Sequence, residues 1–362
     1  MARMNIDDAP RAHGGPDEDE LRALGRDVRS VLDFSVNVNP YGPTDFMREA
    51  IRDAAVERYP DRTATAARTA LAGAWSVDPA RIVLGAGAAE LLWTVVRAVV
   101  RAGDPVVIAE PTFSEARAAA ESAGAIVHEL RATAEARFRH DPGRLAEAVA
   151  RVDARLVYVC APNNPTGLAW PAAELAEVIA RCPGALFLVD QSFLSLSDRH
   201  ADAAVELPAN AVRVRSLTKD HAIPGARVGA LVATPALGHL FETARPAWSA
   251  GAVTQAAATA AAAPSELAFV AESRARLLAD RMALAEDLRT LGWTPLPSST
   301  TFLLASRPDA AAARARLLRE HGILVRSCAS FGLPDHVRLA ARPREDRARL
   351  LSALRSLGFA PC

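Results

Sequence analysis

Short apolar runs alternate with amphipathic or alanine-rich stretches between residues 81 and 232. The runs have the length of buried strands, and the longer stretches are typical of helices. This alternation implies a mostly parallel sheet flanked by helices, because a parallel crossover needs a helix to return the chain. The predicted strands are 81–84, 105–109, 125–130, 155–160, 185–190, 212–217 and 228–232, and the predicted helices are 88–101, 114–123, 144–151 and 172–181. The sequence therefore predicts an α/β fold with a seven-stranded sheet.

The segments on either side of this region predict the domain organisation. Residues 1–45 form an arm punctuated by Gly and Pro, with a strand-like run at 31–38, and we expect it to join the smaller domain. Helical patterns at 44–58 and 63–75 open a large domain, 46–245. Residues 246–362 hold a helical region to about residue 290, broken near Pro264, and then a smaller C-terminal α/β domain. The predicted elements of that domain are a strand at 301–304, a helix at 310–320, strands at 323–326 and 337–341, and a helix at 344–356.

Composition excludes several classes of protein. The 42 basic and 42 acidic residues balance, and no basic run indicates a nucleic-acid surface. Apolar stretches such as 91–100 are too short to cross a membrane, and residues 1–30 lack the apolar core of a signal peptide. The four cysteines have no spacing suited to a metal, so we expect no metal site and a cytoplasmic protein.

Lys219 is the only lysine, and the other 41 basic residues are arginines. A bias toward arginine explains the surface, where either cation is well solvated. It does not explain the exception. An arginine cannot replace a lysine whose neutral amine attacks a carbonyl, because the guanidinium stays protonated. A single lysine that escaped the bias by chance is the alternative, so its surroundings decide.

Ligands bind beyond the carboxyl ends of the strands in an open parallel sheet, so polar residues just after the predicted strands are candidates for a site. Gly85–Glu90 joins a strand to a helix and is either a tight turn or a phosphate cradle. With Glu110 it also permits a remote alternative, a nicotinamide-dependent dehydrogenase. Asp190 ends a strand as a helix cap or as the partner of a buried cation, and Asn164 lies in a turn-forming segment.

The segment around Lys219 favours a catalytic role. Lys219 follows a predicted strand, the hydroxyls of Ser216 and Thr218 come shortly before it, and Arg227 follows eight residues later. Two hydroxyls, an arginine and a helix N-terminus can hold a phosphate dianion. A phosphate-anchored aldehyde beside one amine is what imine chemistry needs.

Taken in order, these motifs resemble the pyridoxal-phosphate (PLP)-dependent aminotransferase superfamily of fold type I, class I/II, from about residue 30 to 345. The matching motifs are Gly85-Ala-Gly87, Pro111-Thr-Phe113, Asn163-Asn-Pro-Thr-Gly167, Asp190, Ser216-Leu-Thr-Lys219, Arg227, Val325-Arg326 and Val337-Arg338-Leu339. The resemblance implies an aspartate-aminotransferase-like large domain, the cofactor pyridoxal 5'-phosphate and a small amino-acid substrate.

The resemblance also implies residue roles. Lys219 forms the Schiff base and shuttles the α-carbon proton, Asp190 pairs with the pyridinium nitrogen, Asn164 bonds the phenolic oxygen, and Phe113 stacks on the ring. The cofactor phosphate is held by Gly87, Ala88, Ala89, Ser216, Thr218 and Arg227, with Tyr59 from a second subunit of a homodimer. Arg338, Arg326 and Asn37 are expected at the substrate.

Within the superfamily the chain is most similar to the threonine-phosphate decarboxylase and histidinol-phosphate aminotransferase families. The stretches 13–15, 32–37, 39–42, 216–229 and 248–249 carry this similarity. Three positions depart from the family pattern: Phe193 replaces a common tyrosine, Gln191-Ser192 replaces Glu-Ala, and Gly251 stands where an asparagine is common.

The resemblance leaves the reaction open. A decarboxylase or aminotransferase acting at the α-carbon of a possibly phosphorylated amino acid is the first hypothesis. The departures support a second, a specialised-metabolism enzyme for β- or γ-elimination, replacement or C–C bond formation.

Overall fold

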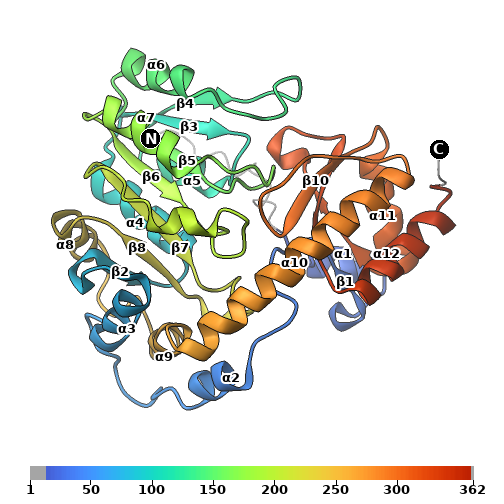
Figure 1. Ribbon diagram of the computed structural model, residues 1–362, viewed down its shortest axis with the longest axis horizontal. Helices are drawn as coiled ribbons and strands as arrows, with labels where there is room; N and C mark the ends of the chain where they lie inside the picture. Colours follow the sequence, from blue (N-terminus) through green and yellow to red (C-terminus); the bar gives the residue numbers. More distant parts are fainter. Residues whose placement is uncertain (1–13, 360–362) are drawn as a thin grey trace.

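The computed structural model describes residues 14–359 and contains a seven-stranded sheet beside a smaller antiparallel one (Figure 1). The strands of the large sheet are β2 (Ile82–Gly85), β3 (Pro105–Glu110), β4 (Ile126–Arg131), β5 (Leu156–Cys160), β6 (Leu186–Asp190), β7 (Ala211–Ser216) and β8 (Gly229–Val232). Their order is β2-β8-β7-β6-β5-β3-β4, and only β8 runs antiparallel to its neighbours. All seven predicted strands are confirmed, within one or two residues at their ends.

Successive side chains of the central strands pack against opposite helical layers, as the period of two requires. On β3, Val106 and Ile108 join one apolar cluster, while Val107 and Ala109 join another. The first face is covered by α4 (Ala88–Val99), α5 (Glu115–Ser122) and α8 (Pro235–Ala244). The second cluster belongs to α6 (Pro142–Val152) and α7 (Ala172–Arg181), and α2 (Asp45–Arg52), α3 (Thr65–Trp75) and α9 (Ala252–Ala261) pack on β2 and β8.

The long helix α10 (Pro264–Thr290) runs from α9 to the smaller sheet (Figure 1). That sheet has the order β12-β13-β10-β9, with β9 at Thr294–Pro295, β10 at Phe302–Ser306, β12 at Arg326–Ser327 and β13 at His336–Ala340. The helices α11 (Ala310–His321) and α12 (Arg344–Ser356) complete its apolar core. The N-terminal arm reaches this part through β1 (Leu32–Asp33), which pairs in parallel with β11 (Ile323–Leu324).

Four expectations about the elements need correction. The helix predicted at 44–58 ends at Arg52; Val56 and Tyr59 are 75% and 79% exposed, so a longer helix would gain little from burial. The strand predicted at 323–326 divides between two partners, β1 and β13. The strand-like run at 31–38 contributes only Leu32–Asp33 to a ladder. Three short or weakly periodic elements were not predicted: α1 (Glu18–Ala23), α8 and β9.

No helix among the described residues is long and apolar enough to span a membrane.

Candidate active site

A cavity of about 280 Å³ lies at the carboxyl ends of the central strands, where the topology of the sheet was expected to place a ligand. The predicted residues that line it are Asn37, Ala88, Ala89, Phe113, Asn164, Asp190, Ser216, Thr218, Lys219, Arg227 and Arg338. Gly87 adjoins the cavity through Arg227, whereas Arg326 and Tyr59 are outside its lining. The fold therefore brings together residues that lie up to 324 positions apart, Gly14 to Arg338.

Lys219 extends its amine into this cavity from the loop after β7. Its Nζ donates to Ser216 Oγ at 3.1 Å and lies 5.0 Å from the centroid of the Phe193 ring. The lysine backbone is fixed as well, because the Asn39 amide donates to the Lys219 carbonyl at 2.9 Å. Removal from solvent lowers the pKa of the Lys219 amine, and the charges of Asp190 and Asp220 offset only part of this effect. A larger neutral fraction favours attack on an aldehyde.

This pKa shift predicts a pH-dependent stability effect in the cofactor-free protein. Since the folded pKa lies below the ordinary value of 10.5, the unfolded chain binds a proton more tightly than the folded one. Burying the charged Lys219 amine lowers the free energy of unfolding. This loss is complete at pH values below the folded pKa and disappears as pH rises toward 10.5. We expect Lys219→Met to be more stable than the unchanged protein near neutral pH, with the difference shrinking at alkaline pH.

Urea midpoints measured for both proteins across this range check the sign. Arg144→Met is a matched control, because Arg144 is exposed and its substitution removes a cation without relieving burial. A Lys219→Met advantage that grows with pH would contradict the prediction.

Asp190, the last residue of β6, is a buried carboxylate held by two donors. Tyr158 Oη donates to Asp190 Oδ2 at 2.9 Å, and the Ser192 amide donates to Oδ1 at 2.9 Å. Burial, together with the Asp190 charge, holds the pKa of Tyr158 well above its usual value, so this phenol keeps its proton. Tyr158 was missed as a site residue. The available signal was its place on β5 beside β6, two positions before the strand end.

One end of the cavity is formed by backbone amides, two hydroxyls and the Arg227 guanidinium. Gly87 precedes α4 at φ 90°, and no side chain caps this helix, so the amides of Ala88 and Ala89 are left for a ligand. The φ of 90° favours glycine at this position, and a Cβ there would also displace the Arg227 guanidinium, since it would lie 2.7 Å from Nη2. Ser216 Oγ and Thr218 Oγ1 lie 2.8 Å apart beside them. This arrangement fits the phosphate group of pyridoxal 5'-phosphate.

Arg338 closes the opposite end of the cavity from β13 of the smaller sheet. Its guanidinium donates to Asn164 Oδ1 and to the Ser35 carbonyl. Burial lowers the pKa of Arg338 to about 10, which still leaves it charged at neutral pH. Among residues 14–359, Arg338 Nε and Asn37 Oδ1 are buried without hydrogen-bond partners. Such unsatisfied groups beside a cavity indicate that a ligand completes their bonding.

Two predicted residues have other surroundings in the single chain. Arg326 pairs with Arg338 across the β12–β13 ladder, and its Nη2 donates to Ser330 Oγ at 2.8 Å. Tyr59 is exposed, and its ring lies 4.8 Å from that of Trp248.

The positions that depart from the family pattern differ in their distance from the chemistry. Ser192 and Phe193 line the cavity, and the Phe193 ring packs edge-on against Phe302 at 4.9 Å. Gln191 is not among the lining residues, and Gly251 precedes α9 as its N-cap. His13 lies outside the described residues.

The acidic residues of the dehydrogenase alternative have structural partners. Glu90 accepts from the Ala86 amide at 3.2 Å and from Thr94 Oγ1 at 2.9 Å. Glu110 accepts from the Thr112 amide at 2.8 Å and pairs with Arg117. In the described part of the chain, no group of three or more His, Cys, Asp or Glu side chains could hold a metal ion.

Comparison with known proteins places this geometry in context. A sequence model described as aminotransferase class I and II matches residues 29–356. The histidinol-phosphate aminotransferase of Symbiobacterium thermophilum is 34% identical over 354 residues, which cover 96% of this chain and 95% of that protein. Histidinol-phosphate aminotransferase 2 of Ralstonia nicotianae is 32% identical over 358 residues, covering 96% and 94%.

A solved structure shows the same architecture. The crystal structure of histidinol-phosphate aminotransferase from Sinorhizobium meliloti, in complex with pyridoxal-5'-phosphate, superposes with a TM-score of 0.85. The match has 28% sequence identity and covers 99% of each chain.

Proposed function

Because the chain belongs to the family of class I and II aminotransferases and uses pyridoxal 5'-phosphate, we propose that it transfers amino groups between a phosphorylated amino compound of the histidinol-phosphate type and a 2-oxo acid. The observation that carries this proposal is the meeting of Lys219, Asp190 and Arg338 in one cavity with a phosphate cradle. When bound, the cofactor supplies an aldehyde and a ring that accepts the electrons of a bond to the substrate α-carbon.

The chain's own residues divide the remaining work. Lys219 Nζ, whose pKa is lowered by burial, takes and returns the proton at the α-carbon. The Asp190 carboxylate, oriented by Tyr158 and Ser192, keeps a proton on the ring nitrogen. Arg338 binds the substrate anion with its guanidinium fork, which suits a carboxylate and a phosphate alike. One arginine therefore serves both substrates of an amino-group exchange.

The other reactions have less support. The relatives compared above are aminotransferases, which favours transamination over decarboxylation. The departures at Gln191 and Gly251 lie outside the cavity lining, so only those at Ser192 and Phe193 still support elimination, replacement or C–C bond chemistry.

The proposal is tested by incubating the holoenzyme with 2-oxoglutarate and either histidinol phosphate or O-phosphothreonine. We expect glutamate to form with histidinol phosphate, and no CO₂ to be released from O-phosphothreonine. Rapid CO₂ release without glutamate would replace the transaminase proposal with the decarboxylase one. Inertness toward both compounds would refute the phosphorylated substrate.

Arg338→Lys is expected to raise the KM for the anionic substrate by about 10- to 100-fold, the usual value of hydrogen bonds to a charged group. Lysine keeps the charge but loses the fork and its bond to Asn164. Steady-state kinetics measure the effect. Arg344→Lys is the matched control, because it makes the same exchange outside the cavity lining. An unchanged KM for Arg338→Lys would remove Arg338 from the substrate site.

We also propose a homodimer that shares its active sites, and a cytoplasmic enzyme. Tyr59 and Trp248 form an exposed aromatic pair, and apolar exposure of this kind suits a subunit interface. Sedimentation should give twice the chain mass of 38.3 kDa. Tyr59→Phe should weaken cofactor binding if its hydroxyl reaches the partner's phosphate site, whereas a monomer with full cofactor affinity would contradict the shared site.

A further inference from the structure

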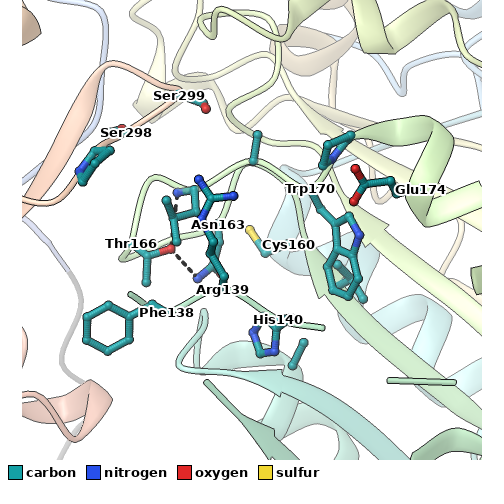
Figure 2. Close-up of a pocket in the computed structure, with 16 residues that line it drawn as sticks. Phe138, Arg139, His140, Cys160, Asn163, Thr166, Trp170, Glu174, Ser298 and Ser299 are labelled. Carbon is teal, nitrogen blue, oxygen red and sulfur yellow. Dashed lines mark hydrogen bonds between the residues drawn. The ribbon is translucent and has the colours of Figure 1, made fainter. Parts of the chain in front are cut away.

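A second cavity, of about 200 Å³, shares Cys160 with the cavity that contains Lys219. Three loops line it: 138–140 between β4 and α6, 163–171 between β5 and α7, and 297–299 between β9 and β10. Figure 2 shows Trp170, Glu174 and His140 on one side of Cys160, and Phe138, Ser298 and Ser299 on the other. Its size is below that of pockets for drug-sized ligands, and it suits an amino acid.

The charged groups of this cavity lack protein partners. Arg139 and Glu174 form no side-chain hydrogen bond or ion pair with any described residue, and both are exposed at the rim. By contrast, Asn163 is fully bonded to Thr112, Pro111 and Thr166. The Arg139 guanidinium and the Glu174 carboxylate together complement the carboxylate and the ammonium group of a zwitterion. Either charge alone would repel the zwitterion group of the same sign.

Two stacked rings give the lining of this cavity a flat, neutral surface. The His140 and Trp170 rings lie parallel, within 1°, with centroids 5.8 Å apart. Burial lowers the pKa of His140 to about 4, so its ring is uncharged at neutral pH and adds apolar surface. Phe138 contributes a further aromatic wall. Such surfaces favour a planar ring over an aliphatic chain.

We propose that this second cavity binds a free amino acid with a planar side chain, its carboxylate on Arg139, its ammonium group on Glu174 and its ring against Trp170. This site is separate from the one that holds the cofactor, and its occupancy does not depend on the proposed reaction.

The second cavity is joined to the active site through short connections. Cys160 lines both cavities, and Asn163 directly precedes Asn164, which accepts from Arg338. The Ser299 amide donates to the Gly167 carbonyl at 2.8 Å, so the loop at 297–299 is tied to the Asn164 loop. A ligand between these loops changes their spacing, and we expect it to shift the KM of the amino donor. This coupling rests on the proposed function.

Calorimetry with L-phenylalanine as the probe tests the binding site. The holoenzyme is first reduced with borohydride, which fixes the cofactor and prevents turnover, so the result is readable even if the proposed reaction is wrong. We expect one L-phenylalanine per chain, bound at least about tenfold more tightly than 3-phenylpropanoate, phenethylamine or L-alanine, because each lacks one contact group.

Charge-removing variants locate the ligand. Arg139→Gln should weaken L-phenylalanine binding about tenfold or more, and so should Glu174→Gln, because each removes a charge-assisted hydrogen bond. The matched controls Arg137→Gln and Glu177→Gln change exposed residues of the same loop and helix that do not line the cavity, and should bind normally. Binding that survives both charge-removing variants, or that is lost only with Arg338→Lys, would overturn the site. If L-phenylalanine binds to the unreduced enzyme and the KM of the amino donor does not change, the coupling between the two cavities would be overturned.

Discussion

Lys219→Ala is expected to lose turnover by on the order of 10⁵-fold or more, comparable to removing the nucleophile of other covalent enzymes. The cavity offers no substitute amine, because the chain contains no other lysine. The Ser216 hydroxyl, 3.1 Å from Nζ, cannot form an imine. Lys219→Arg should fail equally, since the guanidinium keeps the positive charge but cannot be deprotonated.

Mass spectrometry after borohydride reduction shows whether the cofactor is covalently attached to Lys219. The unchanged enzyme should carry the cofactor on the peptide that contains Lys219, and both variants should carry none. Noncovalent binding of the cofactor should persist, because the cradle at Gly87 and Arg227 is intact. Retained turnover in either variant would refute the assignment of Lys219.

Asp190→Asn is the second change with a large expected effect. Asparagine has the same shape but no charge to hold a proton on the ring nitrogen, and we expect kcat to fall about 10²- to 10³-fold, as for the loss of other preorganised electrostatic groups. The loss should fall on kcat rather than on KM, because Arg338 still binds the substrate anion.

Tyr158→Phe provides the control for Asp190→Asn. It removes the 2.9 Å hydrogen bond to Asp190 Oδ2 but leaves the carboxylate and its bond to the Ser192 amide. A single hydrogen bond contributes about 1 kcal/mol, so the loss in kcat should stay below about tenfold. An equal loss in both variants would mean that orientation by Tyr158, rather than the Asp190 charge, sets the rate.

The large sheet was predictable because its signals are local. Runs such as 156–160 and 185–189 consist of apolar and aromatic residues, as strands buried on both faces must. Helix α8 was missed although Thr234 and Pro235 are helix-start signals. The helix predicted at 44–58 was too long, because residues after Arg52 have helix propensity but are not buried by packing. Register and partners decide such boundaries.

That several of the predicted residues would meet in one cavity was expected for the same reason. Gly87, Lys219 and Arg227 lie in short motifs, and the order of these motifs along the sequence carried the resemblance to the aminotransferase superfamily. The contact of Arg338 with Asn164, 174 residues apart, was not, and neither was the bond between Tyr158 and Asp190. These contacts depend on how β13 and the large sheet are placed in space.

The sequence by itself determined the α/β class and singled out Lys219, because strand periodicity and the absence of any other lysine are properties of the chain alone. Only the tertiary structure decided what surrounds that amine. Burial lowers the pKa of Lys219, the neighbouring strand supplies Tyr158 to Asp190, and a separate sheet brings Arg338 to the far end of the cavity. Electrostatic effects depend on distance and on removal from water, and both are set by packing between segments far apart in the sequence.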